Sequence, residues 1–223
     1  DVLKTLGIYD SSTILLTSEH GEAFGEHGVY LHAHHLFDEL TRAPLIVRAP
    51  NMSVRGAYHP LLSQTVDLLP TIVKNSGGEL PAGVQGIELF DQLRKPRAID
   101  PNRVVVSEFS NIGIRRRMVR GYRKKAIVQF PADEAQFLAT VGKKSLLPSV
   151  VFDKEQWSFY RVDKDPLERR NIYSEYRAAE PTWKRLVRIL RAQEAGRATR
   201  DVQVVKSIDA ETLGDLKSLG YIQ

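Results

Sequence analysis

The sequence predicts an α/β fold: part of a sheet sandwiched by helices, followed by a small antiparallel sheet subdomain that has helices of its own. In residues 1–110, short apolar runs alternate with helical patterns, and this order is typical of a sheet covered by helices. In residues 111–223, strand-like segments follow one another through short turns, as in an antiparallel sheet. We therefore expect two domains, 1–110 and 111–223.

The first domain is expected to begin with a helix that ends at Gly7 as its C-cap. The apolar run 13–17 has β-branched residues at both ends and is too short for a helix, so it predicts a strand that is buried on both faces. Residues 18–40 show no period and predict a long loop, with a helical turn near its end. Such loops inside compact domains are usually functional. The other elements expected here are strands at 44–48 and 104–106 and helices at 66–73 and 87–93.

The second domain is expected to contain a β-hairpin, because two strand-like segments are separated by Gly121-Tyr122-Arg123. Residues 131–157 show no period and are interpreted as an insertion. Apolar residues share one face of an amphipathic helix near the end of the chain. The elements expected in this domain are strands at 117–120, 125–129 and 159–162 and helices at 181–193 and 213–219.

The composition is that of an ordinary globular protein, since 42% of the 223 residues are hydrophobic and 26% are charged. No apolar run approaches the roughly 20 residues that span a membrane. The absence of cysteine excludes disulfides and thiolate metal sites. The basic residues behind the net charge of +5 are scattered, which favours an enzyme that attracts anionic substrates over a nucleic-acid-binding protein.

The loop 18–40 holds most of the residues suited to metal binding or catalysis, because five of the six histidines lie between positions 20 and 35. Glu19 and His20 directly follow the strand 13–17, and ligands of α/β proteins bind at the carboxyl ends of strands. Carboxylate oxygens suit calcium, magnesium or manganese, and an imidazole adds zinc or iron. Gly21 permits the turn that both side chains need to reach one cation. The loop therefore predicts a metal site at Glu19 and His20.

The same loop resembles a known motif. Ser18-Glu19-His20-Gly21-Glu22, followed by Phe24-Gly25-Glu26-His27-Gly28, is similar to the Ser-Asp-His-Gly-Glu and Gly-Glu/Asp-His-Gly motif of bacterial sulfatases. Further segments resemble sulfatases in the same order along the chain, at 36–46, 66–72, 159–171 and 216–221. Together these matches identify the chain as resembling the C-terminal portion of a sulfatase.

The resemblance implies an alkaline-phosphatase-like fold and hydrolysis of sulfate esters with one divalent cation, calcium in most members and magnesium, manganese or zinc as alternatives. It implies Glu19 and His20 as metal ligands, with Glu19 where the family has Asp. It implies His32 as the residue that contacts the sulfate or donates a proton, which an imidazole can do near neutral pH. His27 is expected to support the loop by hydrogen bonds, and Asp67 to begin a helix.

The formylglycine nucleophile of the family and two of its acidic metal ligands have no counterpart in this sequence, which holds no Cys/Ser-x-Pro-x-Arg motif. We therefore expect them in a missing N-terminal part, without which the chain is inactive. The expected partners are that part and an anionic sulfated small molecule or glycan, with no nucleic acid. Two alternatives stay open: a metal-dependent phosphomonoester or phosphodiester hydrolase of the same superfamily, and a non-catalytic sulfatase-like binding module.

Overall fold

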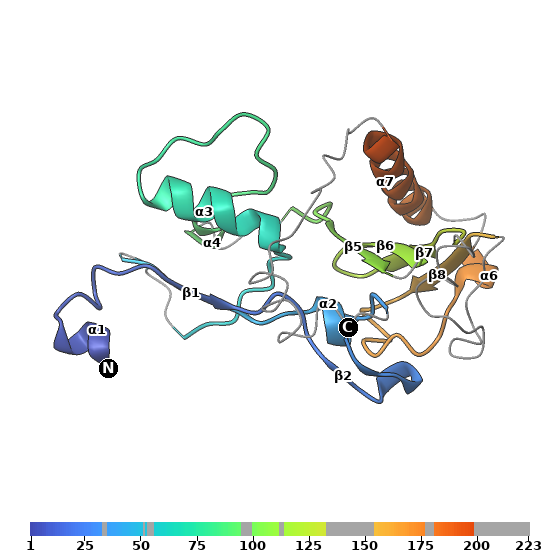
Figure 1. Cartoon of the computed structure of the whole chain (residues 1–223), viewed down its shortest axis with the longest axis horizontal. Helices are drawn as coiled ribbons and strands as arrows, with labels where there is room; N and C mark the ends of the chain where they lie inside the picture. Colours follow the sequence, from blue (N-terminus) through green and yellow to red (C-terminus); the bar gives the residue numbers. More distant parts are fainter. Residues whose placement is uncertain are drawn as a thin grey trace, which may run out of the picture. The chain divides into compact units, whose positions relative to one another are not determined.

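The computed structural model describes residues 1–32, 35–50, 52, 56–94, 100–111, 114–132, 154–176 and 181–198 (Figure 1). By its contacts the chain divides into two units, Asp1–Leu190 and Arg191–Gln223. The domain boundary that the sequence predicts near residue 110 falls within strand β5 (Val105–Asn111) of the first unit and stays a prediction. The predicted helix 213–219 and most of the predicted insertion lie outside the described residues.

Every predicted helix and strand that falls on described residues is found. The strand 125–129 has the predicted bounds, and the bounds of the others are shifted. The elements are α1 (Val2–Thr5), β1 (Ile14–Thr17), β2 (Ala23–Phe24), η1 (Glu26–Gly28), β3 (Tyr30–Leu31), α2 (Asp38–Thr41), β4 (Leu45–Arg48), η2 (Thr65–Asp67), α3 (Leu68–Asn75), α4 (Leu89–Arg94), β5 (Val105–Asn111), β6 (Ile114–Arg120), β7 (Lys125–Gln129), β8 (Gln156–Tyr160), α6 (Tyr173–Tyr176) and α7 (Pro181–Ala198). Among the described residues, no helix is long and apolar enough to cross a membrane.

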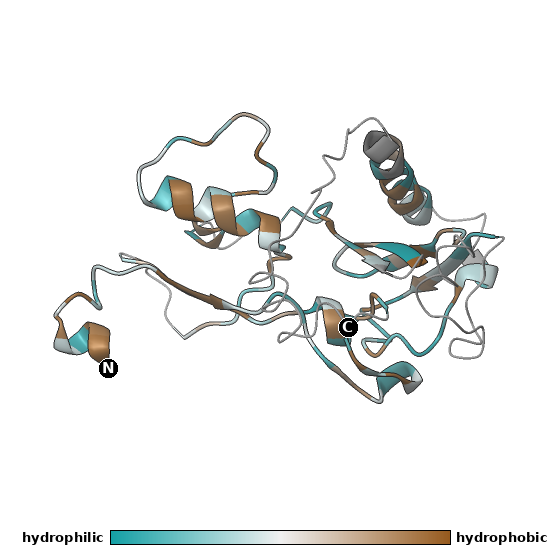
Figure 2. Ribbon diagram, viewed as in Figure 1, coloured by the Kyte–Doolittle hydropathy of each residue, from teal (hydrophilic) through white to brown (hydrophobic). Residues whose placement is uncertain are grey.

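Strand β1 pairs antiparallel with β4, with Leu15 opposite Val47. The expectation that this strand is buried on both faces is wrong for the chain as it stands, because Leu16 is 55% exposed and its partner Ile46 is 63% exposed. Both strands are nevertheless coloured as hydrophobic in Figure 2. The apolar run predicts the strand correctly but not its burial in this structure.

Helix α3 follows a capping box in which Gln64 and Asp67 bond to each other's backbone. Asp67 is fully buried and accepts bonds from the backbone N–H groups of Gln64 and Ile87, both at 2.9 Å. Its carboxylate also pairs with the guanidinium of Arg103. The role predicted for Asp67, at the start of a helix, is therefore confirmed.

The second sheet contains four antiparallel strands in the order β5–β6–β7–β8. Successive residues of a strand point to opposite faces of the sheet, so the two faces carry separate cores. One core joins Val119 and Val128 to the α7 residues Trp183 and Leu186. The core that lies on the other face is built from Met118, Ile127, Tyr160, Val162 and Leu36.

Leu36 belongs to the histidine-rich loop, and its side chain is only 5% exposed against the sheet. The ring of its neighbour Phe37 meets the ring of Tyr160 edge-on at 5.6 Å. Burial of such side chains contributes roughly 1.5–3 kcal/mol each. The four-stranded sheet is thus the support on which the end of the loop rests.

Candidate active site

Glu19 and His20 lie directly after β1, where the sequence predicts a metal site. His20 Nδ1 lies 2.6 Å from the carbonyl oxygen of Gly21, which accepts a hydrogen bond from it. That bond leaves Nε2 as the ring nitrogen that can bind a cation. His20 Nε2 lies 4.0 Å from Glu19 Oε1. The carboxylate of Glu19 is exposed, and the ring of His20 is partly buried.

Gly21 brings the backbone of this segment against helix α2. Its N–H donates to the carbonyl of Leu40 at 2.9 Å, and a Cβ at this position would clash with the carbonyl oxygen of Glu39. Glycine is thus required here by a close contact, which differs from the sharp turn that the sequence predicts at Gly21. The glycine allows two stretches of backbone to approach closely, because its φ lies outside the left-handed region.

The predicted loop contains a short hairpin that the sequence analysis did not foresee. Strands β2 and β3 pair with Ala23 opposite Leu31, and the intervening turn has positive φ at Gly25, His27 and Gly28. Two-residue strands carry no detectable alternation, which is why the sequence showed only a loop. The turn is also held by the carboxylate of Glu26, whose pKa is lowered chiefly because it accepts a bond from the backbone N–H of Phe24 at 2.6 Å.

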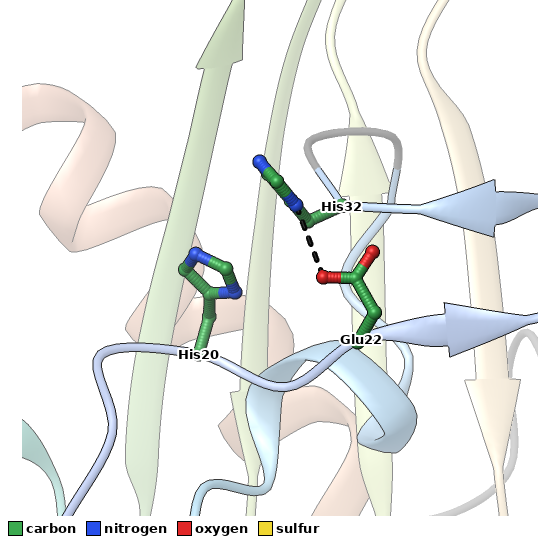
Figure 3. Close-up of side chains that lie close together, drawn as sticks. All are labelled: His20, Glu22 and His32. Carbon is green, nitrogen blue, oxygen red and sulfur yellow. Dashed lines mark hydrogen bonds and ion pairs between the residues drawn. The ribbon is translucent and has the colours of Figure 1, made fainter. Parts of the chain in front are cut away.

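The hairpin returns the chain so that His32 lies beside His20. Their ring centroids are 4.8 Å apart, with the planes tilted by 33°. Glu22 completes the group, because its Oε2 lies 3.1 Å from His32 Nδ1 (Figure 3). One ligand atom from each of these three residues lies within 4.8 Å of the others. The structure thus brings together the predicted residues His20 and His32 and adds Glu22.

Glu22 is the residue of this group that the sequence analysis missed. Its position in the motif gives no reason to prefer it over the other carboxylates of the loop. The hairpin register supplies the signal, since Ala23 opposite Leu31 sets Glu22 opposite His32. Residues that are directly opposite in antiparallel strands have side chains within contact distance.

His27 and His35 form a separate group around Glu39. His27 Nδ1 lies 2.7 Å from Glu39 Oε1 and its Nε2 lies 3.1 Å from the carbonyl oxygen of Glu168. His35 Nε2 lies 3.4 Å from the same carboxylate oxygen of Glu39. Both ring nitrogens of His27 are therefore engaged by the protein, as predicted for a residue that supports the loop. His34 lies outside the described residues.

A buried charge cluster joins the loop to the four-stranded sheet. Lys125 is fully buried, and its Nζ lies 2.9 Å from Asp38 Oδ1 and 3.1 Å from Glu168 Oε2. The backbone N–H of Asp38 donates to Glu168 Oε2 at 2.6 Å. Burial raises the pKa of Glu168 above its ordinary value, against the lowering effect of the Lys125 ammonium.

Comparisons with known proteins agree with this architecture. The sequence model of the family described as Sulfatase matches residues 1–77. The chain is 26% identical over 176 residues to an N-acetylglucosamine-6-O-sulfatase of Bacteroides thetaiotaomicron, covering 77% of this chain and 28% of the relative. It is 25% identical over 207 residues to a Delta 4,5-hexuronate-2-O-sulfatase of the same organism, covering 90% of this chain and 37% of the relative.

A solved structure of a protein in complex with its substrate D-glucosamine-2-N,6-O-disulfate shares the fold with a TM-score of 0.69 at 23% identity. The match covers 92% of this chain and 38% of that chain. The chain therefore spans between a quarter and two fifths of the length of these relatives. A family model that matches residues 1–77, sulfatase relatives and a shared mixed α/β architecture thus show that the chain resembles sulfatases along most of its length and has their alkaline-phosphatase-like fold.

Proposed function

We propose that this chain provides part of the active site of a sulfuric ester hydrolase that depends on one divalent cation. The observation that carries the proposal is the grouping of a carboxylate and two imidazoles. Glu19 and His20 lie directly after β1, with His20 Nε2 4.0 Å from Glu19 Oε1, and the β2–β3 hairpin brings the ring of His32 to 4.8 Å from that of His20. The similarity to sulfatases supports the reaction type.

Glu19 and His20 would hold the cation. Metal–ligand bonds to oxygen and nitrogen are about 2.0–2.6 Å long, so two ligand atoms 4.0 Å apart can both reach one ion. The carboxylate of Glu19 suits calcium, magnesium or manganese, and the imidazole of His20 adds zinc to these choices. A bound cation would stabilise the negative charge of the sulfate oxygens.

His32 would contact the sulfate or the leaving oxygen. Its ring is partly buried and lies beside the ring of His20. An imidazole at this point can donate a hydrogen bond to a sulfate oxygen or a proton to the departing alcohol. Positioned donors of this kind lower the barrier where charge develops in the transition state.

The proposed substrate is an anionic sulfated small molecule or glycan. The relatives are named as sulfatases of N-acetylglucosamine and of hexuronate, and a net charge of +5 favours the approach of anions. The formylglycine and the remaining acidic ligands would come from a further polypeptide segment, the nucleophile-bearing segment. Without it we expect the chain to hydrolyse nothing.

Cation binding can be tested on the chain itself by isothermal titration calorimetry with calcium, magnesium, manganese and zinc. We expect one cation per chain, and at least tenfold weaker binding in Glu19→Ala and in His20→Ala. His59→Ala is the matched control, because His59 lies outside the loop 18–40 and its Nδ1 accepts a local hydrogen bond from the backbone N–H of Leu61. Binding that survives both site variants would contradict the assignment of the ligands.

The reaction can be tested on a polypeptide that also carries the nucleophile-bearing segment, with an aryl sulfate and an aryl phosphate in parallel. We expect the sulfate ester to be preferred and His32→Ala to lose activity.

The second candidate function is that of a phosphoester hydrolase, and one observation favours it. His20, Glu22 and His32 together offer two nitrogens and one oxygen within 4.8 Å of one another, a set that suits zinc or manganese. Preference for the phosphate ester with zinc would replace the first proposal by the second.

A further inference from the structure

Glu22 and His32 face each other across the β2–β3 hairpin. The register that sets Ala23 opposite Leu31 extends by one residue to Glu22 and His32. Figure 3 shows Glu22 directly before β2 and His32 directly after β3, with the hydrogen bond between them drawn. His32 Nδ1 lies 3.1 Å from Glu22 Oε2, and both side chains are about two thirds buried.

A carboxylate at Nδ1 decides which ring nitrogen of His32 is available for chemistry. An ionised carboxylate can only accept, so Nδ1 must carry the hydrogen in this bond. In a neutral imidazole the other nitrogen, Nε2, then has no hydrogen and acts as an acceptor. In both charge states of the ring, proton exchange with a substrate takes place at Nε2, which points away from Glu22 (Figure 3).

The orientation of the ring is fixed by the same bond. A histidine side chain on a loop otherwise rotates about two side-chain torsions, and loss of a partner that orients such a ring typically costs about 10- to 100-fold in the function it supports. The neighbouring His20 has the equivalent arrangement, since its Nδ1 bonds the carbonyl oxygen of Gly21. Both imidazoles of the site are thus held at Nδ1.

We propose that Glu22 is a positioning residue that holds the Nδ1–H of His32 and so presents His32 Nε2 to the ester. This inference rests on the proposed function for the role of His32, whereas the hydrogen bond itself does not. It differs from an assignment of Glu22 as a metal ligand. A His32 Nδ1 that bound a metal would be deprotonated and could not donate to Glu22.

The first test observes the ring directly. Long-range ¹H–¹⁵N NMR spectra of the chain with ¹⁵N-labelled histidine, recorded at a pH where the rings are neutral, report which nitrogen carries the hydrogen. We expect the Nδ1–H form for His32 in the wild type, its loss in Glu22→Ala, and its recovery in Glu22→Gln, whose amide oxygen still accepts. Glu26→Gln, in the same hairpin, is the control and should leave His32 unchanged.

Either of two results would overturn the proposal: a wild-type His32 in the Nε2–H form, or an Nδ1–H form that persists in Glu22→Ala. If Glu22→Ala does not fold, a wild-type His32 in the Nε2–H form still overturns the proposal. Calorimetry adds a third criterion. If Glu22→Ala weakens calcium or zinc binding as much as His20→Ala does, Glu22 is a ligand and the positioning role is wrong.

The second test uses a polypeptide that also carries the nucleophile-bearing segment. On an aryl sulfate we expect kcat to fall about 10- to 100-fold in Glu22→Ala, with KM little changed and with kcat recovered in Glu22→Gln. An unchanged kcat in an active sulfatase would overturn the positioning role alone. Conversely, an Nδ1–H tautomer that depends on Glu22, in a polypeptide without sulfatase activity, would leave the positioning intact and refute the proposed function.

Discussion

Lys125 Nζ lies 2.9 Å from Asp38 Oδ1 and joins the first residue of β7 to the first residue of α2. The same ammonium bonds Glu168 Oε2 at 3.1 Å, and its side chain is fully buried. Because α2 ends the segment that carries Glu19, His20 and the hairpin, one buried cation ties the candidate site to the four-stranded sheet. The stability of the sheet and the geometry of the site are therefore expected to be coupled.

Replacing Lys125 by Met should destabilise the fold strongly. The variant leaves the buried carboxylate of Glu168 without its cation, and breaking a buried ion pair on one side costs about 3–5 kcal/mol. Asp38 retains Arg120, whose Nη1 lies 3.1 Å from Asp38 Oδ2. The measurement is the free energy of unfolding in urea at pH 7.

Two further variants test the cause of that loss. Lys125→Met combined with Glu168→Gln removes both charges and should recover a large part of the lost stability. Arg123→Met removes a cation on the same sheet that pairs with Asp163 but is 75% exposed, and exposed pairs contribute less than about 1 kcal/mol. Equal losses in Lys125→Met and Arg123→Met would show that the buried cluster has no special role.

The sequence predicts three of the four strands of the antiparallel sheet because their signals are local, whereas it assigns the strand 104–106, part of β5, to the first domain. The β6–β7 hairpin follows from two strand-like runs around Gly121, and helix α7 follows from the shared apolar face that carries Trp183 and Leu186. The segment that carries Glu19 and His20 was found from its place after β1 and from its resemblance to a family motif. These features depend on residues that are close in sequence.

The features of the fold and of the site that the sequence does not predict depend on turn geometry and on contacts between residues that are distant in sequence. His27 adopts a φ of 53° in the turn of the β2–β3 hairpin, and a positive φ is uncommon for any residue other than glycine, so the sequence did not indicate it. Glu22 meets His32 only through the register of that hairpin. The cluster around Lys125 joins residues separated by 43 and 87 positions in the sequence, so no periodicity could indicate it.

The two faces of the four-stranded sheet should respond differently to the same truncation. Leu36→Ala, under the loop, and Leu186→Ala, on α7, each remove a side chain that is at most 5% exposed, and each should cost about 2–5 kcal/mol of unfolding free energy. Only Leu36→Ala is expected to weaken cation binding as well, because Leu36 anchors the loop. Urea unfolding and calorimetry measure the two effects, and a loss of cation affinity in Leu186→Ala would contradict this separation.

Gly21→Ala should displace the backbone that carries Glu19 and His20. The added Cβ would clash with the carbonyl oxygen of Glu39, so the backbone after β1 must move away from α2, at a cost of about 1–3 kcal/mol. We expect weaker cation binding together with this loss of stability. Gly121→Ala is the control, because a Cβ there meets its nearest backbone oxygens at 3.9 Å, an ordinary contact distance. Wild-type cation affinity in Gly21→Ala would show that the close approach does not position Glu19 and His20.

The turn that follows β8 should show a defined pH dependence. Hydrogen bonds from Arg161 and then Arg123 lower the pKa of Asp163 from 3.8 to about 2. A carboxyl whose pKa is lower in the folded than in the unfolded state contributes stability that is fully present above the unfolded value. That contribution should therefore be present above about pH 4 and lost as the pH falls toward 2.

In Asp163→Asn this contribution is absent at every pH. Thermal midpoints from circular dichroism should show the wild type above the variant at pH 6, with a gap that closes between about pH 4 and 2. A gap that stays constant over this range would show that the ionised carboxylate of Asp163 does not stabilise the fold.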